Sequence, residues 1–193
     1  MSKHKVLDII QQRRSVRKFS DRPVQRELLL TCIEAARLAP SAENRQPWRF
    51  IILDDPGVRT EFCTAAFSGI YRATRWAQTA PVIVIVLAEL DFITHKLGNA
   101  LQGTPYHYID IGITGEHFVL QAQALGLSTC WIGWFNLKRA KKFLKLPSGM
   151  KLCQLIAVGY AETAKPHRIR KLRDTESIVS FNRWDPDSRE PDS

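Results

Sequence analysis

A basic segment that contains one serine lies where the first predicted helix ends. It reads Arg13-Arg14-Ser15-Val16-Arg17-Lys18-Phe19. Guanidinium groups hold phosphate oxygens through paired charge-assisted hydrogen bonds, and a hydroxyl can satisfy a further oxygen. These residue types therefore suit a phosphate group. Taken alone, the segment is interpreted more simply as a solvated basic helix end that the helix dipole favours.

Two further segments have chemically distinctive patterns. The first is a loop that reads Pro40-Ser41-Ala42-Glu43-Asn44-Arg45-Gln46-Pro47-Trp48, and the second reads Leu125-Gly126-Leu127-Ser128-Thr129-Cys130-Trp131-Ile132-Gly133. The three segments, in this order, closely resemble R-R-S-x-R-x-F, A-P-S-x-x-N-x-Q-P-W-x-F and the flavin-facing strand of the nitroreductase family of FMN enzymes. The ending Phe181-Asn182-Arg183-Trp184 is also similar to that of compact members.

The resemblance implies a divided phosphate site. Arg13, Arg14 and Ser15 would hold the FMN phosphate and nearby ribityl oxygens, and Arg17 would support them. The pair Arg168 and Arg170 would close the phosphate from the other side. Basic residues are dense in this region, so Lys171 or Arg173 could take their part.

The resemblance also assigns residues to the flavin ring. The loop residues that would line the flavin from a partner subunit are Pro40, Ser41, Ala42, Asn44 and Gln46. Ala42 stands where the family has a second serine, which leaves backbone contacts there. Along the ring would lie Trp131, Ile132 and Gly133, the last without a side chain that would block a close backbone approach. Arg72 or Arg75 could replace the asparagine that often contacts the pyrimidine edge.

Hydrophobic periodicity predicts alternating helices and strands. Helices are expected near Val6–Ile10, over 25–38, from Asp55 to about Phe67, over 110–125 and after Asn136. Asp55 and Asn136 can cap their helices, and Gly126 can end the fourth. Strands are expected over 48–53, 81–88, 129–135 and 152–160, with 81–88 as the central strand because it lacks a polar face. A polar loop is expected over 89–105.

The expected fold is α+β, with a central, mostly antiparallel sheet flanked by helices. Residues 1–193 would form one nitroreductase-like FMN-binding domain. The tail over 161–193 is too polar to form a core of its own, so we expect it to pack on something else. The resemblance implies an intertwined homodimer in which each tail crosses to the partner subunit.

Composition narrows the possible functions. The net charge of +9 gathers in residues 13–18, 138–145 and 165–173. This charge would suit a nucleic acid, an anionic cofactor or mere solubility.

Four dispersed cysteines indicate reduced core residues, and no metal-ligand spacing is found. Neither a secretory signal nor a membrane-spanning run is recognisable, so a cytoplasmic location is expected.

The resemblance implies an FMN-dependent oxidoreductase that takes hydride from NADH or NADPH in a ping-pong reaction. Its acceptors would be small electron-poor organic molecules such as nitroaromatics or quinones. No dedicated catalytic acid is expected, since the flavin carries out the chemistry. Flavin fragmentation, dehalogenation and azoline oxidation remain alternatives on the same scaffold. A basic polyanion-binding protein is the remaining alternative, although neither a nucleic-acid nor a membrane partner is expected.

Overall fold

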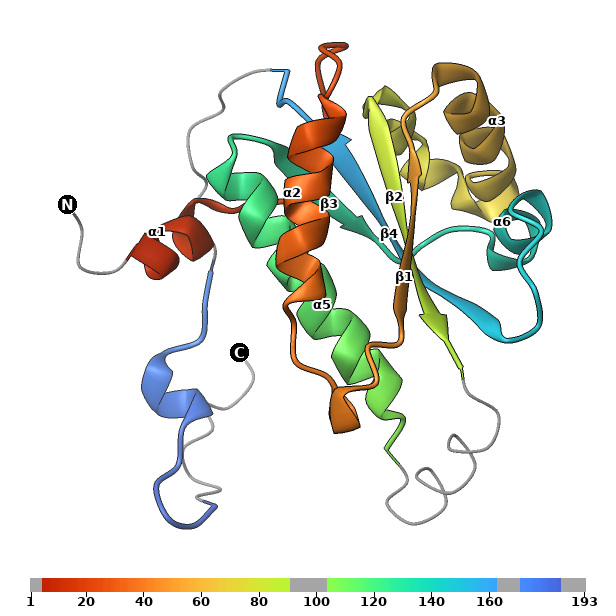
Figure 1. The fold of residues 1–193 in the computed structure, drawn as a ribbon. Helices are drawn as coiled ribbons and strands as arrows, with labels where there is room; N and C mark the ends of the chain where they lie inside the picture. Colours follow the sequence, from red (N-terminus) through yellow and green to blue (C-terminus); the bar gives the residue numbers. More distant parts are fainter. Residues whose placement is uncertain (1–4, 91–103, 163–170, 185–193) are drawn as a thin grey trace.

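The chain forms a four-stranded antiparallel sheet with helices on both faces (Figure 1). A computed structural model describes residues 5–90, 104–162 and 171–184. The strands are β1 (Trp48–Leu53), β2 (Val82–Glu89), β3 (Ser128–Ile132) and β4 (Met150–Gly159), in the order β1-β2-β4-β3. All three neighbouring pairs are antiparallel. The predicted α+β class and the antiparallel sheet are confirmed.

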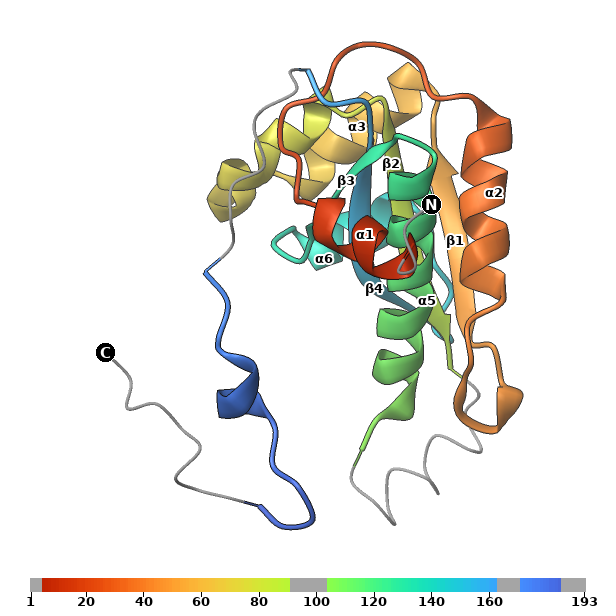
Figure 2. The same cartoon turned by 90° about the vertical axis from the view of Figure 1, so that its left-hand side faces the viewer.

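Helices cover the sheet in two groups. On one face lie α2 (Arg26–Arg37) and α5 (Tyr106–Ala124), and on the other lie α3 (Pro56–Ala66), the 3₁₀ segment η2 (Gly69–Thr79) and α6 (Leu137–Phe143). The remaining elements are α1 (Lys5–Gln12), η1 (Ala42–Asn44) and η3 (Thr175–Ile178). Figure 2 shows α1 lying across α5 on the side of the molecule that faces the viewer.

The central strand explains why the sheet needs two helical layers. Ile83, Ile85 and Leu87 pack toward α3, while alternate residues such as Val84 and Val86 pack toward α2 and α5. Seven of the eight β2 residues are buried, and only Glu89 is exposed. Because side chains alternate between the faces of a strand, an uninterrupted apolar run requires cover on both sides. The sequence prediction of a central strand is confirmed.

The predicted helix-capping residues lie at the ends of their helices. The Asp55 side chain accepts a hydrogen bond of 2.8 Å from the backbone N–H of Val58, which caps α3. Asn136 accepts one of 3.0 Å from the backbone N–H of Arg139, which caps α6. Gly126 follows α5 with a φ of +76°, a left-handed conformation that a glycine adopts without steric cost.

Several predicted boundaries need correction. α5 begins at Tyr106 rather than Asp110, and β3 ends at Ile132 rather than continuing to Phe135. The last three residues of the strand predicted over 129–135 do not extend β3, and Trp134 is exposed and lies outside the sheet. β4 begins at Met150, two residues earlier than expected, and η2 was not predicted. Most of the predicted loop over 89–105 lies outside the described residues.

The core contains two deeply buried thiols, which allow a test. Burial raises the pKa of Cys32 and of Cys63 from 9.0 to about 12. Both thiols should therefore resist a disulfide reagent at about pH 8 in the native protein and react after denaturation in urea.

Because folding raises these two pKa values, the stability that the thiols contribute should be full below about pH 9 and decline toward about pH 12.

Mass spectrometry of the labelled protein identifies which cysteines have reacted. Cys153 is only half-buried, so its labelling serves as the internal comparison. Labelling of Cys32 and Cys63 as fast as that of Cys153, without unfolding, would contradict this description of the core.

Candidate functional site

The basic segment after α1 is anchored to β3. Ser15 forms a parallel bridge with Thr129, and the backbone N–H of Val16 donates a 2.9 Å hydrogen bond to the carbonyl of Thr129. The fixed backbone holds Ser15 beside the strand that leads to Trp131 and Gly133. Two of the predicted site segments, more than one hundred residues apart in sequence, therefore lie side by side.

The basic side chains of this segment have different environments. The Nε atom of Arg13 lies 3.9 Å from a carboxylate oxygen of Glu116, and the Arg13 side chain is only 15% exposed. The Arg17 guanidinium lies 5.8 Å from the centre of the Trp76 ring. Ser15 and Arg17 are exposed, whereas Arg14 is partly buried. Glu116 is half-exposed, and its carboxylate partly balances the charge of Arg13.

The end of β3 combines a buried anchor with an open backbone position. Ile132 is 2% exposed and belongs to the core, whereas Trp131 is partly buried and packs against Gly115 of α5. Gly133 is exposed, and a Cβ atom added to it would meet no atom within 4 Å among the described residues. The backbone after β3 thus borders open space, where a flat ring could approach it.

The segment η2 packs beside this open backbone. The Thr74 hydroxyl donates a 2.8 Å hydrogen bond to the Trp134 carbonyl, and the Trp134 indole N–H donates one of 3.4 Å to the Ile70 carbonyl. The same segment carries exposed Arg72 and Arg75. These contacts place η2 next to Gly133, and the suggestion that Arg72 or Arg75 reaches the flavin edge stays a prediction.

Sequence reasoning missed Trp134. Its side chain is 56% exposed, and its ring centre lies 5.0 Å from that of Tyr71. It falls within the strand predicted over 129–135. The glycine directly before it was the signal that the strand ends there.

The loop of residues 40–46 has a rigid internal structure. Glu43, Asn44 and Gln46 have φ values of 52°, 54° and 50°. The Ser41 hydroxyl accepts a 2.9 Å bond from the Gln46 backbone, and the Gln46 amide donates to the Asn44 side chain at 3.1 Å. Left-handed backbone costs free energy in residues other than glycine, so such strain is typical of functional loops.

This loop does not meet the basic segment within one chain. The Ala42 N–H donates a 3.1 Å hydrogen bond to the Asp110 carboxylate, which fixes the loop near the start of α5. Both ribbon views place it away from the segment that follows α1 (Figures 1 and 2). The predicted ring-lining loop and the predicted phosphate residues are therefore separate in the single subunit. Pro40, at the base of the loop, is exposed.

The structure describes only some of the carboxyl-terminal basic residues that are predicted to bind the phosphate. Arg168 and Arg170 lie outside the described residues, whereas Lys171 and Arg173 are described and exposed. The described tail extends away from the rest of the chain (Figure 2). The choice among these four basic residues stays a prediction.

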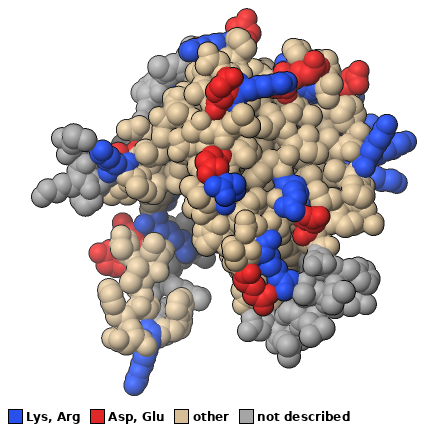
Figure 3. Space-filling model, in the orientation of Figure 1, with Lys and Arg blue, Asp and Glu red and all other residues tan. Residues whose placement is uncertain are grey.

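Surface charge is mixed where it can be seen. On the face in Figure 3, most of the surface is uncharged and basic groups mostly lie beside acidic ones, whereas basic groups stand alone at the right-hand edge, where Figure 1 places α6. α6 carries four basic residues, of which three are exposed and Lys141 is partly buried, while Ala140 is buried. No described helix is long and apolar enough to cross a membrane.

Comparison with known proteins identifies the family of this chain. The profile of the nitroreductase family matches residues 10–160. The NADH dehydrogenase of Thermus thermophilus is 28% identical over 186 residues, with 82% of this chain and 88% of the relative covered. The iodotyrosine deiodinase of Thermotoga neapolitana is 23% identical over 195 residues, with 91% and 96% covered.

A solved structure shares the fold as well. The FMN-dependent nitroreductase from Clostridium difficile R20291 superimposes with a TM-score of 0.72 at 25% identity, and the match covers 92% of this chain and 99% of that one. The family match spans the described sheet, both helical layers and the segments beside Gly133. The chain belongs to the nitroreductase family of NAD(P)H oxidoreductases.

Proposed function

We propose that the protein is an FMN enzyme that takes hydride from NADH or NADPH and reduces small electron-poor molecules, such as nitroaromatics or quinones. One observation carries the proposal. The Ser15–Thr129 bridge sets a cluster of basic side chains beside the strand that ends at the open backbone of Gly133. A phosphate group and a flat ring joined by a short polar chain match these two features.

The residues present suit FMN in their chemistry. Arg13, Arg14, Ser15 and Arg17 would bind the phosphate, because charge-assisted donors are the strongest phosphate ligands in proteins. Backbone N–H groups near Gly133 would face the ring, and Arg72 or Arg75 would place positive charge at its pyrimidine edge. Such donors stabilise negative charge that develops during reduction.

Bound FMN would supply the redox chemistry, accepting hydride and passing electrons to the next molecule in the pocket. The protein's own part is to bind and orient. Trp131, packed on Gly115, would hold one side of the ring site, and Trp134 and Tyr71 would border the entrance. No side chain is assigned as a proton donor in this proposal.

The homodimer is part of the same proposal. α1 buries none of its residues within the chain, and Val6 and Leu7 are 67% and 49% exposed. In the tail, Phe181 is 86% and Trp184 68% exposed. Apolar surface of this extent is commonly covered by another subunit. A partner subunit would also bring its 40–46 loop to the flavin that Arg13 and Ser15 bind.

The spectrum of the purified protein tests the cofactor and the assembly together. We expect a yellow protein that releases FMN rather than FAD on denaturation, since no dinucleotide-binding glycine motif is present. Anaerobic NADH or NADPH should bleach the colour, and light scattering should give a dimer that loses flavin when it dissociates. A colourless protein that FMN cannot reconstitute, or a flavin-saturated monomer, would contradict the proposal.

Reductive dehalogenation is a second candidate reaction. The chain is similar over 91% of its length to an iodotyrosine deiodinase, and this similarity supports dehalogenation as a candidate. With FMN bound and reduced, the protein can be offered 3-iodotyrosine and, separately, a nitroaromatic or a quinone. Release of iodide would favour dehalogenation. Rapid oxidation of the reduced flavin by the quinone or the nitroaromatic, without iodide release from 3-iodotyrosine, would favour the first candidate.

A further inference from the structure

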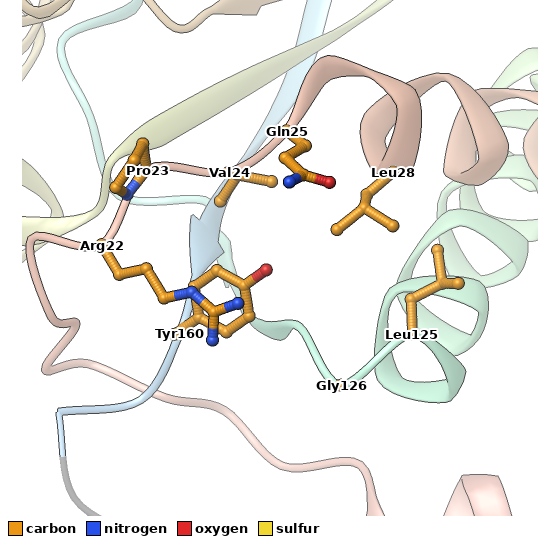
Figure 4. Close-up of a pocket in the computed structure, with 8 residues that line it drawn as sticks. All are labelled: Arg22, Pro23, Val24, Gln25, Leu28, Leu125, Gly126 and Tyr160. Carbon is orange, nitrogen blue, oxygen red and sulfur yellow. The ribbon is translucent and has the colours of Figure 1, made fainter.

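A surface groove of about 660 Å³ lies between the start of α2 and the end of α5. Its volume falls within the usual range for small-molecule sites. Eight residues from three parts of the chain line it (Figure 4): Arg22, Pro23, Val24, Gln25, Leu28, Leu125, Gly126 and Tyr160. Gly126 precedes β3 and Gly133 follows it, so the groove and the open backbone of the proposed flavin site lie at opposite ends of that strand.

A cation is held over an aromatic ring at one side of the groove. The Arg22 guanidinium lies 3.9 Å from the centre of the Tyr160 ring. Nearby backbone is rigid, because the Ser20 N–H donates a 2.9 Å bond to the Tyr160 carbonyl and Phe19 forms a bridge with Ala161. Stacking on a ring orients a guanidinium while it leaves the N–H groups at its edge available.

The Arg22 guanidinium is available to an anionic ligand. Among the described residues, no carboxylate forms an ion pair with it, and none of the eight lining residues is acidic. A carboxylate ligand would therefore meet a cation that is already oriented. The energetic cost of ordering a long side chain on binding is thereby reduced.

Polar and apolar groups face the same space. Figure 4 shows the Tyr160 hydroxyl and the Gln25 amide directed into the groove. Gln25 precedes α2 but its side chain makes no capping hydrogen bond, so the amide is not engaged there. Val24, Leu28 and Leu125 form the apolar part of the wall. The groove thus joins one cation and two polar groups to a hydrocarbon surface.

We propose that this groove binds a small organic monocarboxylate with an apolar body. One guanidinium matches one carboxylate, since the planar fork of N–H groups can hold both oxygens. A phosphate monoester carries more negative charge, and Arg22 is the single cation among the lining residues. The leucines and Val24 would cover an aromatic or branched aliphatic body. This assignment does not depend on the identity of the redox substrate.

Calorimetry on the purified, flavin-loaded dimer or monomer, whichever the protein forms, tests the assignment with benzoate as the probe. Benzamide, which has no charge, and acetate, which lacks the apolar body, serve as comparison ligands. Flavin absorption is recorded during each titration, because binding at the ring would change it. We expect saturable benzoate binding without a flavin spectral change, and markedly weaker binding of both comparison ligands.

Variants connect the binding to named residues. Arg22→Gln should weaken benzoate by about tenfold or more, and Tyr160→Phe by roughly two- to tenfold. The matched control is Arg26→Gln, which removes the same charge from a side chain that pairs with Asp54 at 3.1 Å and does not line the groove. Circular dichroism establishes that each variant is folded.

Three results would overturn the proposal. The first is that the folded wild-type protein does not bind benzoate. The second is that Arg22→Gln leaves benzoate binding unchanged. The third is that a flavin spectral change always accompanies the binding, which would place the ligand at the ring instead. None of these results bears on whether FMN binds, so failure here is distinguishable from failure of the proposed function.

Discussion

FMN should bind roughly ten- to a hundredfold more weakly when Arg14 is replaced by glutamine. A charge-assisted hydrogen bond contributes about 1.5–3 kcal/mol, and about 1.4 kcal/mol corresponds to a factor of ten in affinity. The segment that carries Arg14 is fixed by the hydrogen bond between Val16 and Thr129, so a neighbouring residue cannot readily take its place. Turnover per bound flavin should change little, because the phosphate lies away from the reacting ring.

Titration of the apo variant with FMN, followed by assay of the saturated enzyme, measures the two quantities separately. Flavin retention by the variant should also become more sensitive to salt, since ions screen the remaining charges. Lys142→Gln is the matched control, because it removes one positive charge from exposed α6 without touching the proposed site. Equal FMN affinity of Arg14→Gln and Lys142→Gln would show that the phosphate site has been misplaced.

The substitution Gly115→Ala adds a single methyl group but should lower both the stability of the protein and its affinity for FMN. The Cβ atom of an alanine there would lie 2.1 Å from Cη2 of Trp131, so the indole must move. Forcing extra volume into a packed position costs about 1–3 kcal/mol. Because Trp131 would hold one side of the ring site, we expect Gly115→Ala to lower the free energy of unfolding and weaken FMN binding together.

The same helix provides the control for this substitution. Gly112 is exposed, and an added Cβ there would meet no described atom within 4 Å. Gly112→Ala should therefore stabilise the protein by about 0.5–1 kcal/mol, through helix propensity alone, and leave flavin binding unchanged. Urea unfolding and FMN titration of both variants give the comparison. A Gly115→Ala protein that behaves like Gly112→Ala would mean that Trp131 can move without consequence.

The sequence by itself determined the elements and several of their ends. The apolar run in β2 predicted a strand covered on both faces, and the caps Asp55 and Asn136 predicted where α3 and α6 begin. Such signals depend on residues a few positions apart, so the chain carries them locally. The order of the basic, loop and strand segments also indicated the family, which the match over residues 10–160 confirmed.

Only the tertiary structure decided which of these segments meet. Ser15 lies on Thr129, Thr74 bonds to the Trp134 carbonyl, and the sequence contains no periodicity that pairs them. The same holds for Arg22 over Tyr160, which the pairing of Ser20 with the end of β4 brings together across 140 residues. Contacts at such separations follow from how two helical layers pack on one sheet, and packing depends on the whole core rather than on any local pattern.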